Sequence, residues 1–204
     1  MRKFLFTFTF IFTIVSLSAF ANDKNVNEAQ LIKEIENMTS IQADFTQINE
    51  IKDFGKDEYT GSMAIIKGQK ALWDYKKPFE SWYLFSANKI EFYDKNNNQL
   101  MIYETGEQIT NILLQLLLDI SVAKSKFDIT TNKNIITLKP KEDLGVKFLN
   151  IEMKNNIISS MESTDNIGNN TKIIFSNVVI NKKIDDKIFD KKAPKDAEIF
   201  KQKQ

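Results

Sequence analysis

Apolar and polar residues alternate along most of the chain with the two-residue period of β-strands. Segments rich in isoleucine, phenylalanine, tyrosine and tryptophan are separated by turn-forming asparagine, glycine and lysine. Because all the connections but one are too short for a parallel crossover, we expect an antiparallel meander. The predicted strands span residues 43–52, 59–67, 70–76, 80–86, 89–94, 99–104, 126–131, 134–139, 146–154, 157–165 and 171–181.

Several of these strands are apolar on one face and mixed on the other, because residues two apart point to the same side. A sheet of this kind needs an apolar cover on one face only. The residues that share a face are Trp73 with Tyr75, Trp82 with Leu84, and Leu149 with Ile151 and Met153.

Two stretches have helical periodicity and could supply this cover. In residues 27–38, Leu31, Ile35 and Met38 recur at helical spacing. In residues 107–120, most polar residues form one narrow stripe and the rest are largely leucine and isoleucine, so this helix is buried on most of its circumference. We expect an α+β fold, mainly β: a half-open antiparallel barrel with a helical lid. Large apolar residues beneath such a lid are more often packed core than a ligand pocket.

The first 21 residues have the pattern of a cleaved export signal. Arg2 and Lys3 are basic, residues 4–16 are apolar apart from threonine and serine, and Ala19 and Ala21 provide the small residues that signal peptidase requires. An uncleaved anchor is the alternative, but the apolar run is shorter than the roughly 20 residues of a spanning helix. We expect a signal peptide at 1–21 and one domain at 22–204.

The composition excludes several classes of protein. The chain contains neither cysteine nor histidine, which excludes disulfides, imidazole or thiolate metal sites and histidine-based catalytic triads. Asn22 at the predicted mature start cannot carry acyl chains, so a soluble periplasmic product is expected. Without Arg2 and Lys3, 26 of the 28 basic residues remain against 27 acidic ones, interspersed along the chain, which argues against nucleic-acid binding.

One catalytic pattern is present, an S-x-x-K formed by Ser121 and Lys124. The K-T-G that accompanies it in penicillin-binding enzymes is absent, and Ser121 follows a predicted helix instead of opening one. Two carboxylates could hydrolyse a glycosidic bond, but no acidic pair has an informative spacing. We therefore expect no enzyme, no cofactor and no metal, with a small exported hydrolase as the alternative.

Particular residues also occur in a characteristic order along the predicted domain. They are Phe45, Thr46 and Gln47; Gly61; Lys67, Gly68, Leu72, Trp73, Tyr75 and Pro78; Leu138, Lys139, Pro140 and Lys141; Asp165, Gly168, Thr171 and Phe175; and Phe189 with Pro194. This order resembles the LolA family of periplasmic lipoprotein carriers of Gram-negative bacteria. The resemblance covers residues 31 to about 199.

The resemblance implies an unclosed antiparallel barrel of about eleven strands, with a helical lid over a hydrophobic cavity that takes up the acyl chains of lipoproteins. The family is not enzymatic. Its partners would be acylated lipoproteins, an inner-membrane lipoprotein-releasing ABC transporter as donor and an outer-membrane acceptor such as LolB, and the chain would be a monomer. An acceptor of the LolB kind would carry a lipidated cysteine, which this chain lacks.

From the resemblance and the alternation we expect acyl chains to contact large apolar residues of the strands and both helices. Which face of each strand points inward is not fixed by the alternation. The candidates are Leu31, Ile35, Phe45, Ile65, Leu72, Trp73, Trp82, Leu84, Phe92, Met101, Ile112, Leu113, Leu116 and Phe148.

The chain departs from the family pattern where an arginine followed by proline commonly precedes the tryptophan strand. That arginine bonds lid backbone in the closed form, and here the positions are Lys67 and Gly68. A lysine latch would make fewer simultaneous contacts, because an ammonium lacks the planar fork of arginine. A solvated lysine at a strand end is the alternative for Lys67. Ala71 and Asp196 also replace residues usual in the family.

The sequence is also compatible with three other functions. A LolA-like protein could bind another amphiphile such as a glycolipid, or sense lipoproteins. An exported hydrolase would lose activity on substitution of Ser121 or an acidic residue while retaining lipid binding. An adhesive or scaffolding β domain would have a fully packed interior.

Overall fold

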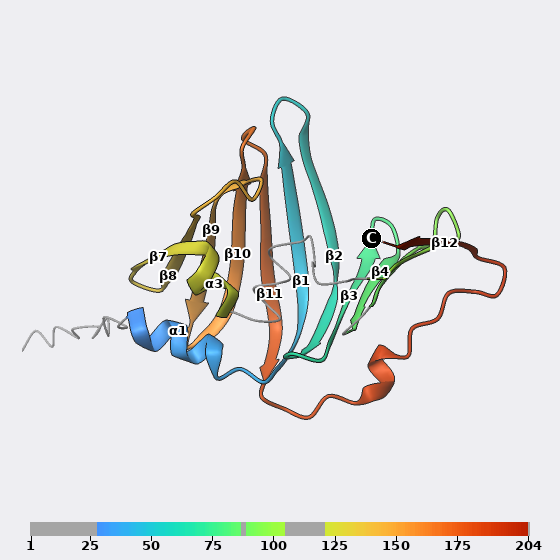
Figure 1. Ribbon diagram of the computed structural model, residues 1–204, viewed down its shortest axis with the longest axis horizontal. Helices are drawn as coiled ribbons and strands as arrows, with labels where there is room; N and C mark the ends of the chain where they lie inside the picture. The colour runs from blue at the N-terminus through green and yellow to red at the C-terminus, as the bar shows by residue number, and fades with distance from the viewer. Residues whose placement is uncertain (1–27, 87–88, 105–120, 204) are drawn as a thin grey trace, which may run out of the picture.

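The computed structural model describes residues 28–86, 89–104 and 121–203, which form one sheet of twelve strands with short helices against it (Figure 1). The sheet order is β12-β6-β5-β4-β3-β2-β1-β11-β10-β9-β8-β7. The strands are β1 (Ser40–Ile51), β2 (Gly55–Ile66), β3 (Lys70–Lys77), β4 (Ser81–Ser86), β5 (Lys89–Asp94), β6 (Gln99–Glu104), β7 (Phe127–Asn132), β8 (Ile135–Pro140), β9 (Val146–Lys154), β10 (Ile157–Asp165), β11 (Asn170–Ile180) and β12 (Glu198–Lys203). The helices are α1 (Glu28–Glu36), α3 (Ser121–Lys126) and the 3₁₀-helix η1 (Asp186–Phe189).

All eleven predicted strands are present, and no boundary is wrong by more than four residues. The largest error is the start of β2, which begins at Gly55 instead of residue 59. Residues 55–58 are polar on both faces, so they carry no alternation. These residues nevertheless pair with β1, and the last pair of partners in the β1–β2 register is Ile51 with Gly55.

The sheet consists of two antiparallel meanders joined side by side. Strands β1 to β6 form one and β7 to β11 the other, and antiparallel pairing of β1 with β11 joins them. The two edge strands, β7 and β12, lie at opposite ends of the molecule (Figure 1), so the sheet does not close on itself. This confirms the predicted unclosed antiparallel architecture.

The twelfth strand is a correction to the expected meander, whose last predicted strand spans residues 171–181. β12 pairs with β6 in parallel, with Ile199 beside Leu100 and Phe200 beside Met101. A parallel neighbour needs a long connection, and residues 181–197, the C-terminal segment, provide it along the outside of the sheet (Figure 1). The strand was missed because it is largely polar and its partner β6 is distant in the sequence.

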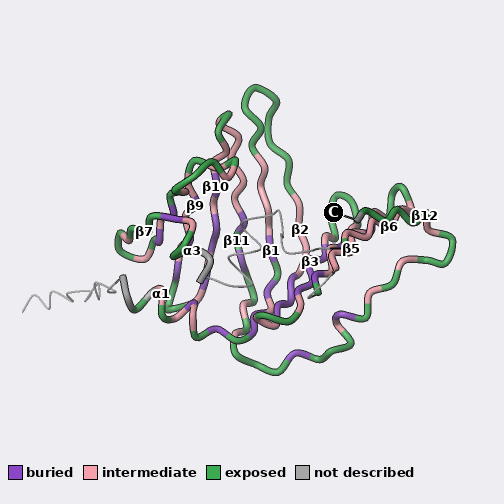
Figure 2. Tube along the Cα trace, in the orientation of Figure 1, coloured by how far each residue is buried: buried purple, intermediate pink, exposed green. Residues whose placement is uncertain are grey.

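Side chains pack on both faces of β2 and β3, contrary to the expectation of cover on one face only. Met63, Ala64 and Ile65 are buried in succession on β2, and residues 71–74 are buried on β3. We call inner the face that carries Met63, Ile65 and Trp73, and outer the face that carries Ala64 and Leu72. Figure 2 shows buried residues running through β3 and β10.

The inner face carries the larger core. Ile35 of α1, Met38 just after α1 and Ala123 of α3 belong to this core, in which Leu138 and Leu149 have no exposed surface. The first predicted helix is confirmed, although α1 ends at Glu36. The second predicted helix, 107–120, lies outside the described residues.

The outer face of β2 to β6 is covered by the C-terminal segment. Its residues Ile184 and Phe189 are buried against Leu72, Trp82 and other apolar side chains. Lys191 forms an ion pair with the buried Asp74 at 2.8 Å, and Asp186 pairs with Lys70 at 2.7 Å. The ammonium of Lys70 also lies 4.8 Å above the ring centre of Phe189. These contacts fasten the segment to β3.

Gly61 allows the ring of Phe45 to lie directly on β2. The two residues are partners in the β1–β2 register. A Cβ at Gly61 would lie 2.7 Å from Cζ of Phe45 and would overlap the carbonyl oxygen of Asp74. The β2–β3 register shifts between Thr60 and Gly61, so this close approach coincides with a bulge.

Gly61→Ala should therefore lower the free energy of unfolding by about 1–3 kcal/mol, because the added methyl forces backbone and ring apart. Urea denaturation measures the loss. Gly68→Asn is the matched control: Gly68 has φ +69° with open space around it, and asparagine tolerates this conformation. Equal stability of Gly61→Ala and the unaltered protein would contradict this account.

Candidate functional site

The inner face carries a continuous series of aromatic rings that crosses the sheet from β11 to β5. The ring centroids of Phe45 and Trp73 are 4.7 Å apart, those of Phe45 and Tyr75 5.2 Å, and those of Tyr83 and Phe92 4.3 Å. We call this set the aromatic surface. It comprises Phe45, Tyr59, Trp73, Tyr75, Tyr83, Phe85, Phe92 and Phe175.

Strand register explains why these rings meet. Met63, Trp73, Tyr83, Phe92 and Met101 are successive cross-strand partners on β2 to β6. Directly opposed residues of antiparallel strands have Cβ atoms about 4.5–5.5 Å apart on the same face. One row of large apolar side chains therefore runs straight across this half of the sheet.

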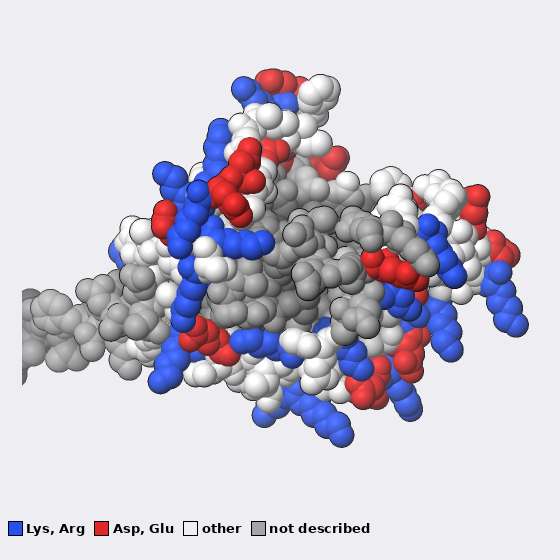
Figure 3. Space-filling view, in the orientation of Figure 1, with Lys and Arg blue, Asp and Glu red and all other residues white. Residues whose placement is uncertain are grey.

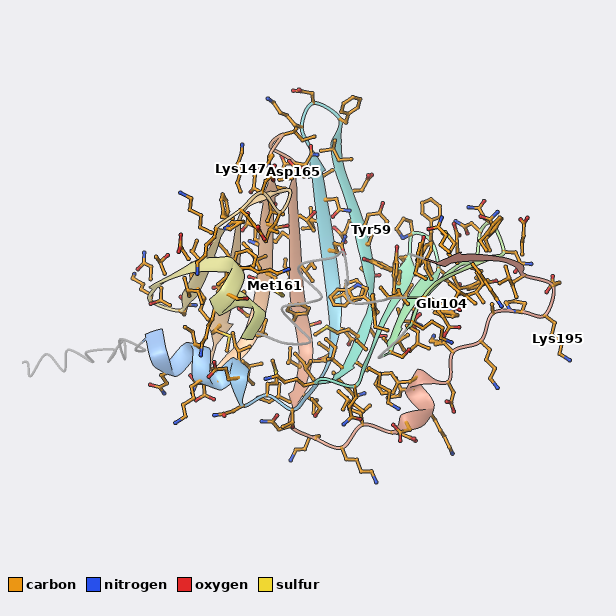
Figure 4. The ribbon with its side chains drawn as sticks, viewed as in Figure 1. Tyr59, Glu104, Lys147, Met161, Asp165 and Lys195 are labelled. Carbon is orange, nitrogen blue, oxygen red and sulfur yellow. The ribbon has the colours of Figure 1, made fainter. Side chains whose placement is uncertain are left out.

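Exposure changes along that row. Trp73 is 8% exposed, whereas Tyr83, Phe92 and Met101 are only partly buried. On the other half of the inner face, Met161 of β10 is 1% exposed. Figure 4 labels Met161 and Tyr59 on either side of the central β1–β11 pair. The inner face is thus packed over β8 to β10 and retains accessible apolar surface over β4 to β6.

A pocket of about 280 Å³ lies at the end of the aromatic surface farthest from α1. Tyr75 Oη donates to Gln47 Oε1 at 2.8 Å, and Gln47 Nε2 donates to Asn49 Oδ1 at 3.0 Å. The pocket is lined by Gln47, Asn49, Tyr59, Tyr75, Phe79, Ser81, Tyr83, Phe92, Asp94 and Asn96.

The environment of the aromatic surface has low polarity. Burial, followed by the neighbouring Tyr83, raises the pKa of Tyr75, and burial also raises the pKa of Tyr83. Trp73 Nε1 is buried without a hydrogen bond of standard geometry in the described part of the chain. Its N–H still lies near enough to Tyr75 to oppose part of the rise in pKa. Such a surface suits apolar ligands.

Glu36, the last residue of α1, connects that helix to two other elements. Lys67, in the turn after β2, donates from Nζ to the Glu36 carbonyl oxygen at 2.7 Å. Lys124 of α3 forms an ion pair with the Glu36 carboxylate. The Lys67 ammonium also lies at the negative end of the helix dipole. The structure thus places Lys67 against helix backbone, and its role as a latch remains a prediction.

The ion pair between Lys124 and Glu36 bears on the S-x-x-K pattern. A lysine that serves as a base has to approach the serine as a free amine, whereas the Lys124 ammonium is used to join α3 to α1. The side chain of Ser121 is not described. The arrangement gives Lys124 a structural role and no support for catalysis.

The structure brings together part of the predicted site. Ile35, Phe45, Ile65 and Trp73 are buried in the inner core. Phe92 and Met101 lie in the cross-strand row that contains Trp73. The side chain of Leu31 is not described, and Ile112, Leu113 and Leu116 lie outside the described residues.

The structure places Leu72, Trp82 and Leu84 on the opposite face of the sheet from those residues. All three pack in the outer cluster against the C-terminal segment, because adjacent residues such as Leu72 and Trp73 point to opposite faces of a strand. Phe148 is likewise on the face opposite Leu149, which belongs to the inner core. The alternation could not choose the face, because β3 is buried on both.

Several rings of the aromatic surface were missed as site residues. They could have been found from strand spacing and register, since Tyr75 lies two residues after Trp73 and Tyr83 is the cross-strand partner of Trp73. Phe175 faces Phe45 across the β1–β11 pair, and that pairing is not apparent from the sequence.

A larger cavity, about 490 Å³, lies on the outer face between the sheet and the C-terminal segment. Its walls include Asp74 and Lys191, which form an ion pair, together with Asp44, Asn177 and Ile188. Hydrocarbon in this space would remove water from charged groups at a high cost. The aromatic surface is therefore the better candidate for an apolar ligand.

The distribution of charged side chains does not indicate a binding site. Lysine and acidic side chains are interspersed around the periphery of the face in Figure 3. Within the described residues, no group of three or more metal-ligating side chains is close enough to hold an ion. No described helix has the length and apolar character needed to cross a membrane.

Comparison with known proteins identifies relatives along most of the chain. The sequence model of the family described as "Outer membrane lipoprotein carrier protein LolA" matches residues 36–192. An outer-membrane lipoprotein carrier protein of Methylococcus capsulatus is 28% identical over 184 residues, which is 86% of this chain and 88% of that one. A protein of the same description from Pseudomonas fluorescens is 28% identical over 200 residues, covering 94% and 96%.

The fold also matches a solved structure. An uncharacterised conserved protein from Thermus thermophilus superposes with a TM-score of 0.55 at 12% identity, covering 85% of this chain and 98% of that one. At this identity the match concerns the fold alone.

Lys67→Met should loosen α1, because it removes the hydrogen bond to the Glu36 carbonyl oxygen. Hydrogen exchange of the α1 amides should rise by about fivefold, corresponding to a net loss of roughly 1 kcal/mol. Lys77→Met, at the exposed end of β3, is the control and should leave α1 unaffected. Equal exchange in both variants would show that Lys67 does not hold the helix.

Stability should fall as the pH rises above about 10, the ordinary pKa of tyrosine. Because the pKa values of Tyr75 and Tyr83 are raised in the folded state, these tyrosines ionise first in the unfolded chain. The free energy of unfolding therefore falls as the pH rises. Urea unfolding between about pH 8 and 11, the range that brackets this ionisation, should give a shallower decline for Tyr75→Phe. Identical slopes for the variant and the unaltered protein would contradict the burial of this phenol.

Proposed function

This chain belongs to the LolA family of outer-membrane lipoprotein carrier proteins, and we propose that its aromatic surface shelters the acyl chains of lipoproteins. The family resemblance noted in the sequence is confirmed by the match over residues 36–192. The carrier role follows from membership, and the location of the acyl chains is our inference from the structure.

One observation carries this location. The row from Met63 to Met101 is buried at one end and partly exposed at the other, on the face where α1 and α3 pack. The outer face of the same strands is closed by the C-terminal segment. An apolar ligand can therefore reach the inner face of β4 to β6 without displacing the segment that completes the outer core.

Flat rings suit acyl chains because they offer apolar area with little directional demand. Burial of an acyl chain gains about 0.8 kcal/mol per CH₂, so one long chain gains on the order of 10 kcal/mol before costs. A carrier must also release its cargo. Parting α1 from the inner face would offset some of this gain, and the contact of Lys67 with Glu36 is one that such a motion would break.

The remaining features of the carrier cycle are proposals that rest on the family. The chain would act in the periplasm as a monomer after removal of residues 1–21, with no enzymatic step. It would receive acylated lipoproteins from an inner-membrane ABC transporter and deliver them to an outer-membrane acceptor of the LolB kind. The names of relatives from Methylococcus and Pseudomonas support outer-membrane lipoproteins as cargo.

Two variants on adjacent strands test which face binds the acyl chains. Phe92→Gln places an amide on the partly exposed inner row and should weaken binding of a tripalmitoyl-S-glyceryl-cysteine peptide by about tenfold, or roughly 1.4 kcal/mol. Leu84→Gln makes a comparable change on the outer face of β4 and should leave the affinity within about twofold. Fluorescence titration of both folded proteins gives the two constants.

If Leu84→Gln weakens binding as much as Phe92→Gln, the inner face is not the specific site. If the unaltered protein does not bind the lipopeptide, the carrier proposal fails.

In the native cell, depletion of the protein should cause mature lipoproteins to accumulate at the inner membrane, whereas normal sorting would favour a different amphiphile as ligand.

A further inference from the structure

We infer that the 280 Å³ pocket at the end of the aromatic surface is a polar subsite that binds the ester and amide carbonyls of the lipid head group, and so fixes the direction in which the cargo lies. This inference rests on the proposed function, because it assumes that acyl chains occupy the aromatic surface, whose residues Tyr59, Tyr75, Tyr83 and Phe92 also line the pocket. It assigns a second, chemically different part to the same site.

Polarity changes in the same direction along three strands. On the inner face, each strand has apolar residues toward α1 and polar ones toward the pocket. From the end near α1 to the end near the pocket, the inner-facing residues are Ile41, Ala43, Phe45, Gln47 and Asn49 on β1; Ala71, Trp73 and Tyr75 on β3; and Ile90, Phe92 and Asp94 on β5. An amphiphile bound here has its lowest free energy with tails toward α1 and head toward the pocket.

The hydrogen bonds of Gln47 and Asn49 leave donors available. Tyr75 Oη donates to Gln47 Oε1, and Gln47 Nε2 donates to Asn49 Oδ1. Each of the two amide oxygens thereby accepts one hydrogen bond from a protein donor. An N–H of Gln47 and the Nδ2 group of Asn49 can still donate to a ligand, since each primary amide carries two N–H bonds.

Hydroxyl groups add to this excess of donors. Tyr59, Ser81 and Tyr83 line the pocket, and none of their hydroxyls is hydrogen-bonded to another of the residues that the structure describes. Burial raises the pKa of Tyr83, so its phenol stays protonated and able to donate. Hydroxyl and amide donors together match the carbonyl oxygens of esters and amides.

The acidic residue of the pocket is hydrogen-bonded within its own turn. Asp94 Oδ1 accepts from the backbone N–H of Asn96 at 2.9 Å, and Asp94 Oδ2 accepts from Asn97 Nδ2 at 2.7 Å. Its carboxylate thus stabilises the β5–β6 turn. The pocket presents donors without a lysine or arginine among its described lining residues, which favours neutral carbonyls over a phosphate group.

The test uses a variant that removes donors but retains shape: Tyr59→Phe, Tyr83→Phe and Asn49→Leu combined in the full chain. Two probes are titrated, the tripalmitoyl-S-glyceryl-cysteine peptide and N-phenyl-1-naphthylamine, an apolar dye without carbonyl groups. Affinity for the lipopeptide should fall by about tenfold or more, because several net hydrogen bonds are lost. Affinity for the dye should remain within about twofold.

An unchanged affinity for the lipopeptide would overturn the subsite and reduce these residues to a solvated rim. An equal loss for both probes would also overturn it, because the effect would then lie in the apolar surface. Met101→Gln distinguishes the two proposals, because Met101 lies on the cross-strand row but does not line the pocket: this variant should weaken both probes if acyl chains bind the inner row, whatever the outcome at the pocket. Tyr59→Phe alone, which keeps the ring, provides the same comparison should the combined variant fold poorly.

Discussion

The packing of the C-terminal segment on the outer face is the contact on which the rest of the structure depends. A chain without cysteine has no disulfides, so its stability must come from packed cores. Phe189 and Ile184 complete one core on Leu72 and Trp82, and the ion pair of Lys191 with Asp74 holds the segment in place. Strands β2 to β6 are thereby stabilised from outside. Their inner face can then retain partly exposed rings over β4 and β5 without loss of the fold.

The strands could be predicted almost completely, because alternation and turn residues are local signals. Which face of each strand points inward could not be predicted. The reason is clear at β3, where residues 71–74 are all buried. When both faces of a strand are covered, the alternation of apolar and polar residues no longer shows which side chains share a surface. Leu72 and Trp73 were therefore assigned to one surface, although their side chains point to opposite faces of the sheet. β12 was not predicted, because its pairing with β6 depends on a long connection and its own sequence is largely polar. The hydrogen bond from Lys67 to the backbone of α1 follows from no pattern in the chain, and the family resemblance suggested only a contact with the lid.

A carrier needs a site that binds hydrocarbon well and still releases it. The aromatic surface supplies contact area, while the attachment of α1 through Glu36 involves one hydrogen bond from Lys67 and one ion pair with Lys124. Interactions of this kind at partly exposed positions contribute little individually. Opening at α1 would break these two polar contacts and would also expose Ile35 and Met38, which are buried in the inner core. In the proposed complex, the polarity change toward Gln47 and Asn49 gives the bound molecule a direction. The fold thus combines a sheet that is packed on both faces with a short helix, α1, that is held by a few apolar and polar contacts.

The two tryptophans of the chain allow the central claim to be tested directly, because Trp73 lies on the inner face and Trp82 on the outer face. Variants that keep one tryptophan, Trp82→Phe and Trp73→Phe, are titrated with a lipopeptide whose acyl chains carry bromine, a short-range quencher of indole fluorescence. Acyl chains on the aromatic surface should quench Trp73 strongly and Trp82 weakly. Equal quenching of both, or stronger quenching of Trp82, would contradict the account.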